Sequence, residues 1–309
     1  MNNKTAVILG NTNLKYSWFY LTYKQGLQLN GYIVYDIDYK SNSLSNIKQQ
    51  LIKIKSSICF THLTFHGNIN PIGSVLQMYS EVSKQVGTKF IHTCNDARTE
   101  DRYMGDVSHA YYMGIVGTFD MQKNCEKAWG IPVHYVPYSS LVYCNIAKPV
   151  QDLAFKEAVF TGSVGAHKDR QDFLHRLGQR IPIKTFQTQT ANDLRFRTPE
   201  LSMSAKCILG LCTGYDIPGY IDVRPFQYLG SGATMIMRKF WRMDDLIPDS
   251  LYYPITSYGE DGVAEAVDHY HRILKEDTSE MQRAAFGYIQ RFHSCKVRMA
   301  EVLNKIKRG

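Results

Sequence analysis

The sequence predicts an α/β protein built from two Rossmann-like domains, each with a parallel sheet that is covered by helices on both faces. Three observations support this fold class. Short apolar runs rich in β-branched residues alternate with helix-like segments along the 309 residues. These runs are continuous rather than alternating in polarity, which is typical of parallel strands buried on both faces. The alternation also pauses once, near the middle of the chain, and then resumes, which indicates two domains.

The two series of elements can be placed from these patterns. In the first half, strands are expected at 5–10, 32–37, 57–61, 88–93, 113–117 and 133–136, and helices near 14–29, 44–55, 72–86 and 120–129. Residues 137–153 contain two prolines and follow no regular period, so they are interpreted as the interdomain linker. In the second half, strands are expected at 156–161, 182–186, 206–211, 233–237 and 251–255, and helices at 168–179, 198–204, 222–230, 260–274 and 278–307.

These ranges predict an N-terminal domain over 1–140 and a C-terminal domain over 141–285. The last segment, 286–309, is expected to be helical and to pack back on the N-terminal domain. Two open sheets joined in this way are expected to face each other across a cleft at the carboxyl ends of their strands, where such sheets bind ligands.

Composition excludes several classes of protein. Hydrophobic residues make up 44% and charged residues 21%, which are ordinary values for a globular chain. No run approaches the roughly 18 apolar residues of a membrane span. The seven cysteines are odd in number and include no CxxC pair, which argues against a disulfide framework or zinc site and favours a cytoplasmic location. The net charge of +8 is compatible with a polyanionic partner such as nucleic acid, and equally with none.

The first motif with chemical content is AVFTGSVGAHKDRQDFL, residues 158–174. An apolar strand runs into Gly162 and Ser163, and a helix follows from about Lys168, with Arg170 in its first turn. Glycine lets a backbone approach a ligand closely, and a helix N-terminus attracts phosphate. The two basic side chains would add positive charge. The segment therefore predicts a phosphate site, the other interpretation being an ordinary glycine-containing turn.

The second motif is AKCILGLCTGYDIPGYIDVRPFQYLGSGATMIM, residues 205–237. It places Arg224 and Gln227 in a short helix after a strand and a glycine-rich loop, and Gly232 and Ala233 just before the next strand. Together with the FTGS block and the V-x-Y-x-P pattern at 133–137, this order resembles the C-terminal domain of GT-B glycosyltransferases. It is similar in particular to the spore-maturation-protein-like family of such enzymes. The resemblance covers about residues 130–305.

The resemblance implies a site for a nucleotide-sugar, with a UDP-sugar as co-substrate and no intrinsic cofactor or required metal. Gly162, Ser163, Lys168 and Arg170 would face the diphosphate, while Gly232 and Ala233 would allow close backbone approach to phosphate. Arg224 and Gln227 would lie on the nucleotide side, although Arg224 has a simpler possible role as an ion pair with Asp222. The family usually has an acid where this chain has Gln227, and an amide can hydrogen-bond ribose hydroxyls but carries no charge.

The N-terminal domain is expected to supply the base that removes the proton of the acceptor hydroxyl. Its candidates are polar side chains near the predicted carboxyl ends of strands. Asp96 is the first choice as the base and His66 the second, and each has an alternative role as a capping or packing residue. Asn11 follows the first strand and is expected beside the donor. Further polar residues at these strand ends are His62, His92, Asn95 and Arg98.

Three functions remain open at this stage, and the acceptor is open as well. Besides a transferase, two Rossmann-like domains permit a dinucleotide-dependent oxidoreductase, with Asp36 or Asp38 as the ribose acid. The change to Gln227 also permits a binding protein without activity. The acceptor could be a hydroxymethylated pyrimidine in double-stranded DNA, as for phage base-glucosylating enzymes of this fold, or a protein or cell-surface glycan. For DNA, the candidate aromatic residues for stacking on an extruded base are Tyr16, Trp18, Tyr111 and Tyr112, although core packing is the favoured role for any one of them.

Overall fold

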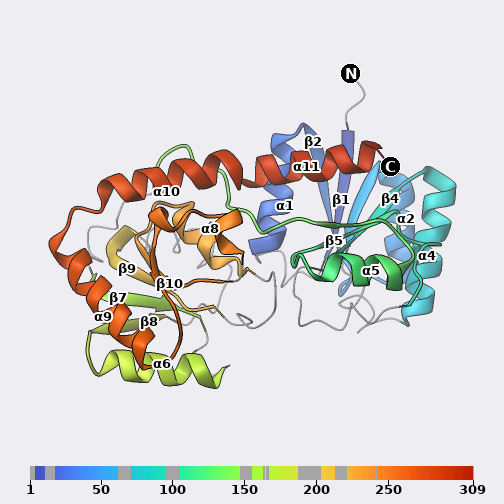
Figure 1. Cartoon of the computed structure of the whole chain (residues 1–309). Helices are drawn as coiled ribbons and strands as arrows, with labels where there is room; N and C mark the ends of the chain where they lie inside the picture. Colours follow the sequence, from blue (N-terminus) through green and yellow to red (C-terminus); the bar gives the residue numbers. More distant parts are fainter. Residues whose placement is uncertain are drawn as a thin grey trace. The chain divides into compact units, whose positions relative to one another are not determined.

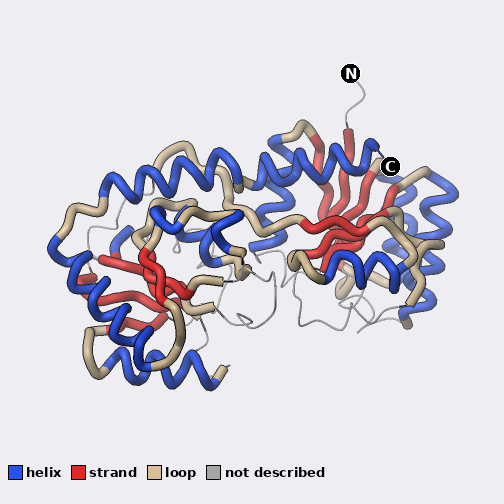
Figure 2. Tube along the Cα trace, in the orientation of Figure 1, coloured by secondary structure: helices blue, strands red, loops and turns tan. Residues whose placement is uncertain are grey.

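The structure is a computed structural model that describes residues 4–10, 18–61, 71–94, 105–146, 155–162, 164, 167–186, 203–212, 221–240 and 242–308. The chain forms two compact units. One comprises Met1–Pro137 together with Cys295–Gly309, and the other comprises Tyr138–Ser294. Each unit contains one parallel sheet flanked by helices (Figures 1 and 2). The two Rossmann-like domains that the sequence predicts are therefore present.

The first unit has a six-stranded sheet in the order β2-β1-β3-β4-β5-β6, and all the strand pairs are parallel. Its strands are β1 (Lys4–Gly10), β2 (Tyr32–Asp38), β3 (Ile58–Thr61), β4 (Lys89–Cys94), β5 (Met113–Val116) and β6 (Val133–Tyr135). The helices of its continuous part are α1 (Trp18–Leu29), α2 (Leu44–Ile54), α4 (Ile72–Val86) and α5 (Met121–Trp129). The central strands β3 and β5 are buried along their whole length, as their unbroken apolar sequences predict.

The last helix, α11 (Cys295–Arg308), belongs to this first unit. It packs against α1 at Gly26, where a Cβ atom would lie only 2.6 Å from the carbonyl oxygen of Cys295. The carbonyl oxygen of Ile306, near the end of α11, accepts hydrogen bonds from Lys89 Nζ and Tyr112 Oη, both at 3.2 Å. The buried residues Met299, Val302, Leu303 and Ile306 join the core of the first sheet.

The second unit has a five-stranded parallel sheet in the order β11-β10-β9-β7-β8. Its strands are β7 (Phe155–Thr161), β8 (Ile183–Phe186), β9 (Ala205–Gly210), β10 (Met235–Arg238) and β11 (Tyr253–Ile255). Its helices are α6 (Lys168–Gly178), α8 (Arg224–Leu229), α9 (Glu260–Lys275) and α10 (Ser279–Phe292), with 3₁₀ turns η4 (Met243–Asp245) and η5 (Asp249–Leu251). Helices α6 and α9 pack together on one face of the sheet, and α8 contacts α10 on the other (Figure 1).

One expected element differs from the structure. The sequence predicts a single helix over 278–307, but the helix stops at Phe292 and a new one starts at Cys295. The carbonyl oxygen of His293 accepts a hydrogen bond from the amide of Ser140 at 2.9 Å, and Ser294 forms a bridge with the same residue. A distant segment thus takes the backbone groups that would continue the helix. Of the helix expected at 198–204, the structure describes residues 203 and 204.

Over the described ranges, no helix is both long and apolar enough to cross a membrane.

Candidate functional site

The carboxyl ends of the five strands of the second sheet lie at one edge, because all of the strands are parallel. From β7 the chain continues to β8 on one side, and it later returns to β9 on the other side of β7. The strand order therefore reverses between β7 and β9. Open α/β sheets bind ligands at this kind of switch point, next to the carboxyl ends of the strands. The residues that follow β7 and β9 are thus the first place to look for a site.

Gly162 follows β7 and allows an arginine to approach the backbone closely. Its φ of +126° lies in the region that favours glycine. A Cβ atom on this residue would lie 2.8 Å from Nη2 of Arg224, the first residue of α8. Nη1 of Arg224 donates to Asp222 Oδ2 at 2.5 Å. The ion pair that the sequence offers as a simpler role for Arg224 is therefore present, and it orients the guanidinium toward the end of β7.

Helix α8 is attached to β7 by a second contact. The hydroxyls of Tyr228 on α8 and Thr161 in β7 form a hydrogen bond, and both residues are buried. Tyr228 lies four residues after Arg224, so both side chains leave the helix on the same side. The short helix and the end of β7 are consequently held together at two points.

Arg170, in the first turn of α6, lies across the switch point. Its side chain is buried, with 4% of the residue exposed. The guanidinium carbon lies 5.3 Å from the centroid of the Phe160 ring in β7. Nη1 donates to the carbonyl oxygen of Leu211, directly after β9, at 3.5 Å. Arg170 therefore touches both strands between which the order reverses.

The two arginines are close enough to affect each other's charge. Burial lowers the pKa of the Arg170 guanidinium, and the positive charge of Arg224 lowers that pKa further. Burial is the largest influence on Arg224 and acts to lower its pKa, but Asp222, Cys212 and Tyr228 together outweigh burial, so the net pKa of Arg224 is raised. Asp222 acts to raise the pKa of both groups. Two guanidiniums beside a shared carboxylate suit an anion with several oxygens, such as a diphosphate.

The amino end of α6 adds to this positive region. The helix begins at Lys168, and the side chain of His167 at the N-cap makes no capping hydrogen bond. Lys168 itself is exposed. Because α6 follows β7, its first turn lies at the same edge of the sheet as Gly162. Amide groups at a helix N-terminus carry partial positive charge and favour phosphate.

A pocket of about 350 Å³ lies at this edge of the sheet. It is lined by Asp169, Asp172, Arg176, Arg238, Tyr258 and Gly259. The hydroxyl of Tyr258 donates to the carbonyl oxygen of Cys212, the second residue after β9, at 2.7 Å. Burial and then Cys212 raise the pKa of Tyr258, while Arg238, Arg224 and Arg170 act to lower it. Tyr258 thus connects the pocket to the arginine site.

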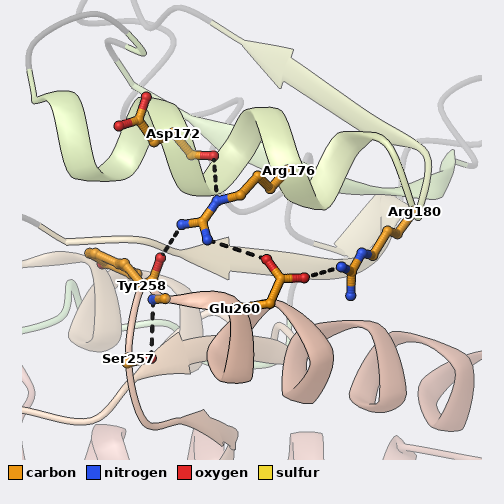
Figure 3. Close-up of polar contacts among 7 residues, drawn as sticks. Asp172, Arg176, Arg180, Ser257, Tyr258 and Glu260 are labelled. Atoms are coloured by element: carbon orange, nitrogen blue, oxygen red, sulfur yellow. Dashed lines mark hydrogen bonds and ion pairs between the residues drawn. The ribbon is translucent and has the colours of Figure 1, made fainter.

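Salt bridges and hydrogen bonds from α6 fix one wall of this pocket (Figure 3). Arg176 Nη2 donates to the carbonyl oxygen of Tyr258 at 2.5 Å, and Nη1 lies 3.4 Å from Glu260 Oε2. Arg176 Nε donates to the carbonyl oxygen of Asp172 at 3.3 Å. Arg180, two residues after the end of α6, also forms an ion pair with Glu260. These contacts hold the loop before α9 against α6.

Gln227 lies three residues after Arg224 and therefore on the same face of α8. Only 3% of the residue is exposed. Among the described residues, its Nε2 has no hydrogen-bond partner. A buried donor without a partner is costly, so a ligand that accepts a hydrogen bond here would relieve that cost.

Gly232 and Ala233 lie elsewhere, since α8 runs away from the carboxyl edge and they follow its far end. Gly232 has a φ of +96°, and a Cβ atom on it would lie 2.6 Å from Cγ2 of Ile146. The missing side chain therefore makes room for the linker segment, which accounts for this glycine without a phosphate. Ala233 is fully buried. The structure does not bring these two residues together with Arg224 and Gly162.

Several predicted residues lie outside the described part of the chain. These are Asn11, His62, His66, Asn95, Asp96, Arg98, Ser163 and the stacking candidate Tyr16, and the side chain of Trp18 is likewise not described. The predicted bases Asp96 and His66, the loop residue Asn11 and the turn residue Ser163 therefore stay predictions.

The described candidates in the first unit are packing residues. His92 lies inside β4 and is fully buried, with its ring centroid 4.7 Å from that of Trp129 and 5.2 Å from that of Tyr111. Tyr111 is itself buried, and Tyr112 lies beneath Lys89, whose Nζ is 3.9 Å from the ring centroid. His92 and Tyr111 therefore pack in the core instead of serving as a site residue and a base-stacking residue. Tyr112 caps the end of α11 instead of stacking on a base.

The acids considered for an oxidoreductase also have local partners. Asp36 forms an ion pair with Lys24 at 2.5 Å. Asp38 accepts hydrogen bonds from the Ser41 hydroxyl at 2.7 Å and the Lys40 amide at 2.9 Å. The Asp36 ion pair joins α1 to β2, and the Asp38 contacts stabilise the turn after β2, so both acids have a local structural role.

Two residues near the site are not singled out by the sequence, namely Tyr228 and Arg238. The i, i+4 spacing from Arg224 is a signal that could have identified Tyr228. No local pattern identifies Arg238, because it reaches the site only through strand order. Within the described ranges, no group of three His, Cys, Asp or Glu side chains is placed to hold a metal ion.

Comparisons with known proteins complete the description. No protein-family model and no curated protein sequence matches the chain. Among solved structures, Anabaena HepE in complex with UDP is similar with a TM-score of 0.64 and 9% identity, over 99% of this chain and 100% of that one. A glycosyltransferase from Rickettsia africae gives 0.60 and 11%, over 100% and 99%. The β-glucosyltransferase of phage T4, in complex with UDP-glucose, gives 0.60 and 13%, over 99% and 98%.

The chain has the GT-B fold. At these identities the likeness concerns the fold, and the chemistry must be argued from the site. The GT-B fold that the sequence resemblance implies is therefore confirmed. The narrower resemblance to spore-maturation-protein-like enzymes stays a prediction.

Proposed function

We propose that this protein is a glycosyltransferase that moves a sugar from a nucleotide-sugar, a UDP-sugar in the first instance, to an acceptor hydroxyl. The observation that carries the proposal is the pair of neighbouring guanidiniums, Arg170 and Arg224, beside Gly162 at the switch point of the second sheet. In such a transfer the bond between the sugar and the diphosphate breaks, and the leaving diphosphate gains negative charge. Fixed cations at that position stabilise this charge as it develops.

The remaining donor groups are assigned by their position relative to the arginines. The N-terminus of α6 and Lys168 would face the diphosphate, and Ser163 is assigned there from the sequence resemblance alone. The pocket lined in part by Arg238 and Tyr258 lies at the same edge of the sheet and is large enough for the base of the nucleotide. Gln227 Nε2 would donate to the ribose, which satisfies its buried nitrogen. The three comparison structures are consistent with this donor, since two of them hold UDP or UDP-glucose.

The acceptor proton requires a base, which we assign to Asp96, with His66 as the second choice. The new bond forms between the acceptor oxygen and the anomeric carbon of the sugar, while the diphosphate leaves with the bonding electrons. The base takes the hydroxyl proton. Arginines and a helix N-terminus can neutralise the leaving group, so we expect turnover to persist in EDTA.

UDP binding is the direct test of the donor site. At about 100 times the dissociation constant, UDP should stabilise the folded protein by about 2.7 kcal/mol, measured as a rise in the melting temperature. Release of UDP from a UDP-sugar then distinguishes an enzyme from a binding protein, and a nicotinamide absorbance change would indicate an oxidoreductase. If no nucleoside diphosphate shifts the melting temperature, the donor-site assignment is wrong.

For the acceptor we propose a hydroxymethylated pyrimidine in double-stranded DNA, and a protein or cell-surface glycan is the second candidate. The net charge of +8 is compatible with a polyanionic acceptor. The chain is similar in fold to the T4 β-glucosyltransferase and to a β-glucosyltransferase that modifies DNA, and this similarity supports a DNA acceptor.

Salt dependence and product analysis test the DNA acceptor. With about four phosphate contacts, the logarithm of the affinity for duplex DNA should fall against the logarithm of salt with a slope near −3.6. A duplex with hydroxymethylpyrimidines should gain the mass of a sugar, and the unmodified duplex should not, because the added hydroxyl is the nucleophile. Negligible duplex binding at low salt would rule out the DNA acceptor, and a protein or cell-surface glycan would then be the proposed acceptor.

A further inference from the structure

The position of Arg224 depends on what holds α8, because this helix has only six residues. A helix of this length is not stable by itself in water. Val223 at its N-cap makes no side-chain capping hydrogen bond. Tertiary contacts must therefore fix its direction and, with it, the placement of the guanidinium beside Gly162.

The end of α10 supplies two of these contacts, and Figure 1 shows α10 running above α8. The ring centroid of His293 lies 5.2 Å from that of Phe226, a fully buried residue in the middle of α8. Gln290 Nε2 donates to the carbonyl oxygen of Gly230, directly after α8, at 2.8 Å. The middle and the far end of the helix thus both rest on the last turn of α10.

Gln290 also holds the segment by which the chain enters the second unit. Its Nε2 donates to the carbonyl oxygen of Leu141 at 2.9 Å, and its Oε1 accepts from the amide of Tyr143 at 3.3 Å. A Cβ atom on Gly230 would lie 2.2 Å from Ser140 Oγ, so this segment and the end of α8 are in tight contact. One carboxamide therefore joins the entering segment, α10 and the end of α8.

The segment by which the chain leaves the second unit is held at the same place. The amide of Ser140 donates to the carbonyl oxygen of His293 at 2.9 Å, and the second unit ends at Ser294. The two segments through which the units are connected thus meet at the helix that carries Arg224.

We propose that Gln290, assisted by His293, is a positioning residue for the donor site, and that it acts through Arg224. It sets the direction of α8, so that the donor affinity depends on the segments that lead to the other unit. The inference rests on the proposed function, because the anion that Arg224 receives is the donor diphosphate. Replacing the carboxamide by an isosteric apolar group would leave the carbonyls of Leu141 and Gly230 without this donor and release the end of α8.

The test compares Gln290→Leu with Gln282→Leu as a matched control. Gln282 is on the same helix and donates to Thr234 Oγ1 at 3.0 Å, just before β10, and not to the carbonyl of Gly230 at the end of α8. Titration with UDP, well below the melting temperature of each variant, should show ~10-fold weaker binding for Gln290→Leu and unchanged binding for Gln282→Leu. Both variants should melt earlier, so a change in melting temperature alone does not support the proposal. Unchanged UDP affinity in Gln290→Leu would overturn it.

A double-mutant cycle then asks whether Gln290 acts through Arg224. In an Arg224→Ala background, Gln290→Leu should cause a clearly smaller loss of UDP affinity than in the wild type, the remainder reflecting Gln227 on the same helix, whereas independent roles would give additive losses and contradict the proposal. If Arg224→Ala binds too weakly to titrate, Arg224→Lys replaces it and the loss should be smaller than in the wild type. If Gln290→Leu does not fold, His293→Leu is used instead, since it removes the ring contact with Phe226. Failure of the wild type to bind UDP would instead refute the proposed function.

Discussion

His92 in the first unit and Arg170 in the second are both buried polar residues beside parallel strands, yet their surroundings are opposite. His92 lies between the rings of Trp129 and Tyr111 in the core of its unit. Arg170 lies beside a second guanidinium and the carbonyl oxygen that follows β9. The two residues are similarly buried, so burial alone does not identify a site.

The neighbours of each side chain make the distinction. Aromatic rings around an imidazole fill space and fix one conformation, which is a contribution to packing. Two neighbouring guanidiniums repel each other, and an arrangement of this kind is typical of functional sites, where a bound anion removes the repulsion. The comparison therefore assigns a packing role to His92 and supports the proposed role of Arg170 and Arg224 in ligand binding.

The largest expected effect comes from removing the arginines. Arg170→Ala and Arg224→Ala should each lower turnover of a UDP-sugar by at least ~100-fold while the protein stays folded, because each removes a cation that stabilises the leaving group. Steady-state release of UDP measures the effect, and circular dichroism checks the fold. Arg272→Ala is the matched control, since Arg272 pairs with Glu276 on the exposed side of α9. Normal turnover in both site variants would show that Arg170 and Arg224, like His92, have no role in the reaction.

At His92, the buried residue compared with Arg170, we expect a substitution to lower stability without weakening UDP binding. His92→Ala should lower the free energy of unfolding by about 2 kcal/mol, because it leaves a cavity among the rings of Trp129 and Tyr111. Urea denaturation gives this value, and titration with UDP should give the wild-type affinity. A weaker UDP affinity with undiminished stability would mean that His92 belongs to the site.

A smaller change tests how closely Arg224 must approach β7. Gly162→Ala should lower the free energy of unfolding by about 1 kcal/mol, because alanine is strained at a positive φ and its Cβ atom meets the guanidinium. The displaced Arg224 should also bind UDP more weakly than in the wild type. Gly87→Ala is a suitable control, since Gly87 also has a positive φ but has open space around it. Equal UDP affinity in both variants would show that the close approach has no role in binding.

The comparison also explains which predictions from sequence succeed. Continuous apolar runs such as CILG in β9 identify buried parallel strands because both faces of the sheet demand the same residues. The strand-turn-helix order around Gly162 and Arg170 places these residues at the carboxyl edge, because in a parallel sheet every turn from a strand into a helix lies at that edge. Gly232 could not be interpreted in this way, because a glycine required by Ile146 has the same sequence signal as one required by a phosphate. The break at His293 was hidden as well, since the apolar periodicity continues across it and the cause lies at Ser140.

The attachment of α11 to the first unit has a consequence for biosynthesis. The second unit occupies one uninterrupted stretch, Tyr138–Ser294, whereas the core of the first unit includes Met299, Val302, Leu303 and Ile306. A ribosome adds these four residues only after the entire second unit has been made. The unit that begins first is therefore the last to complete its core, and until then the surface of α1 around Gly26 remains open to chaperones.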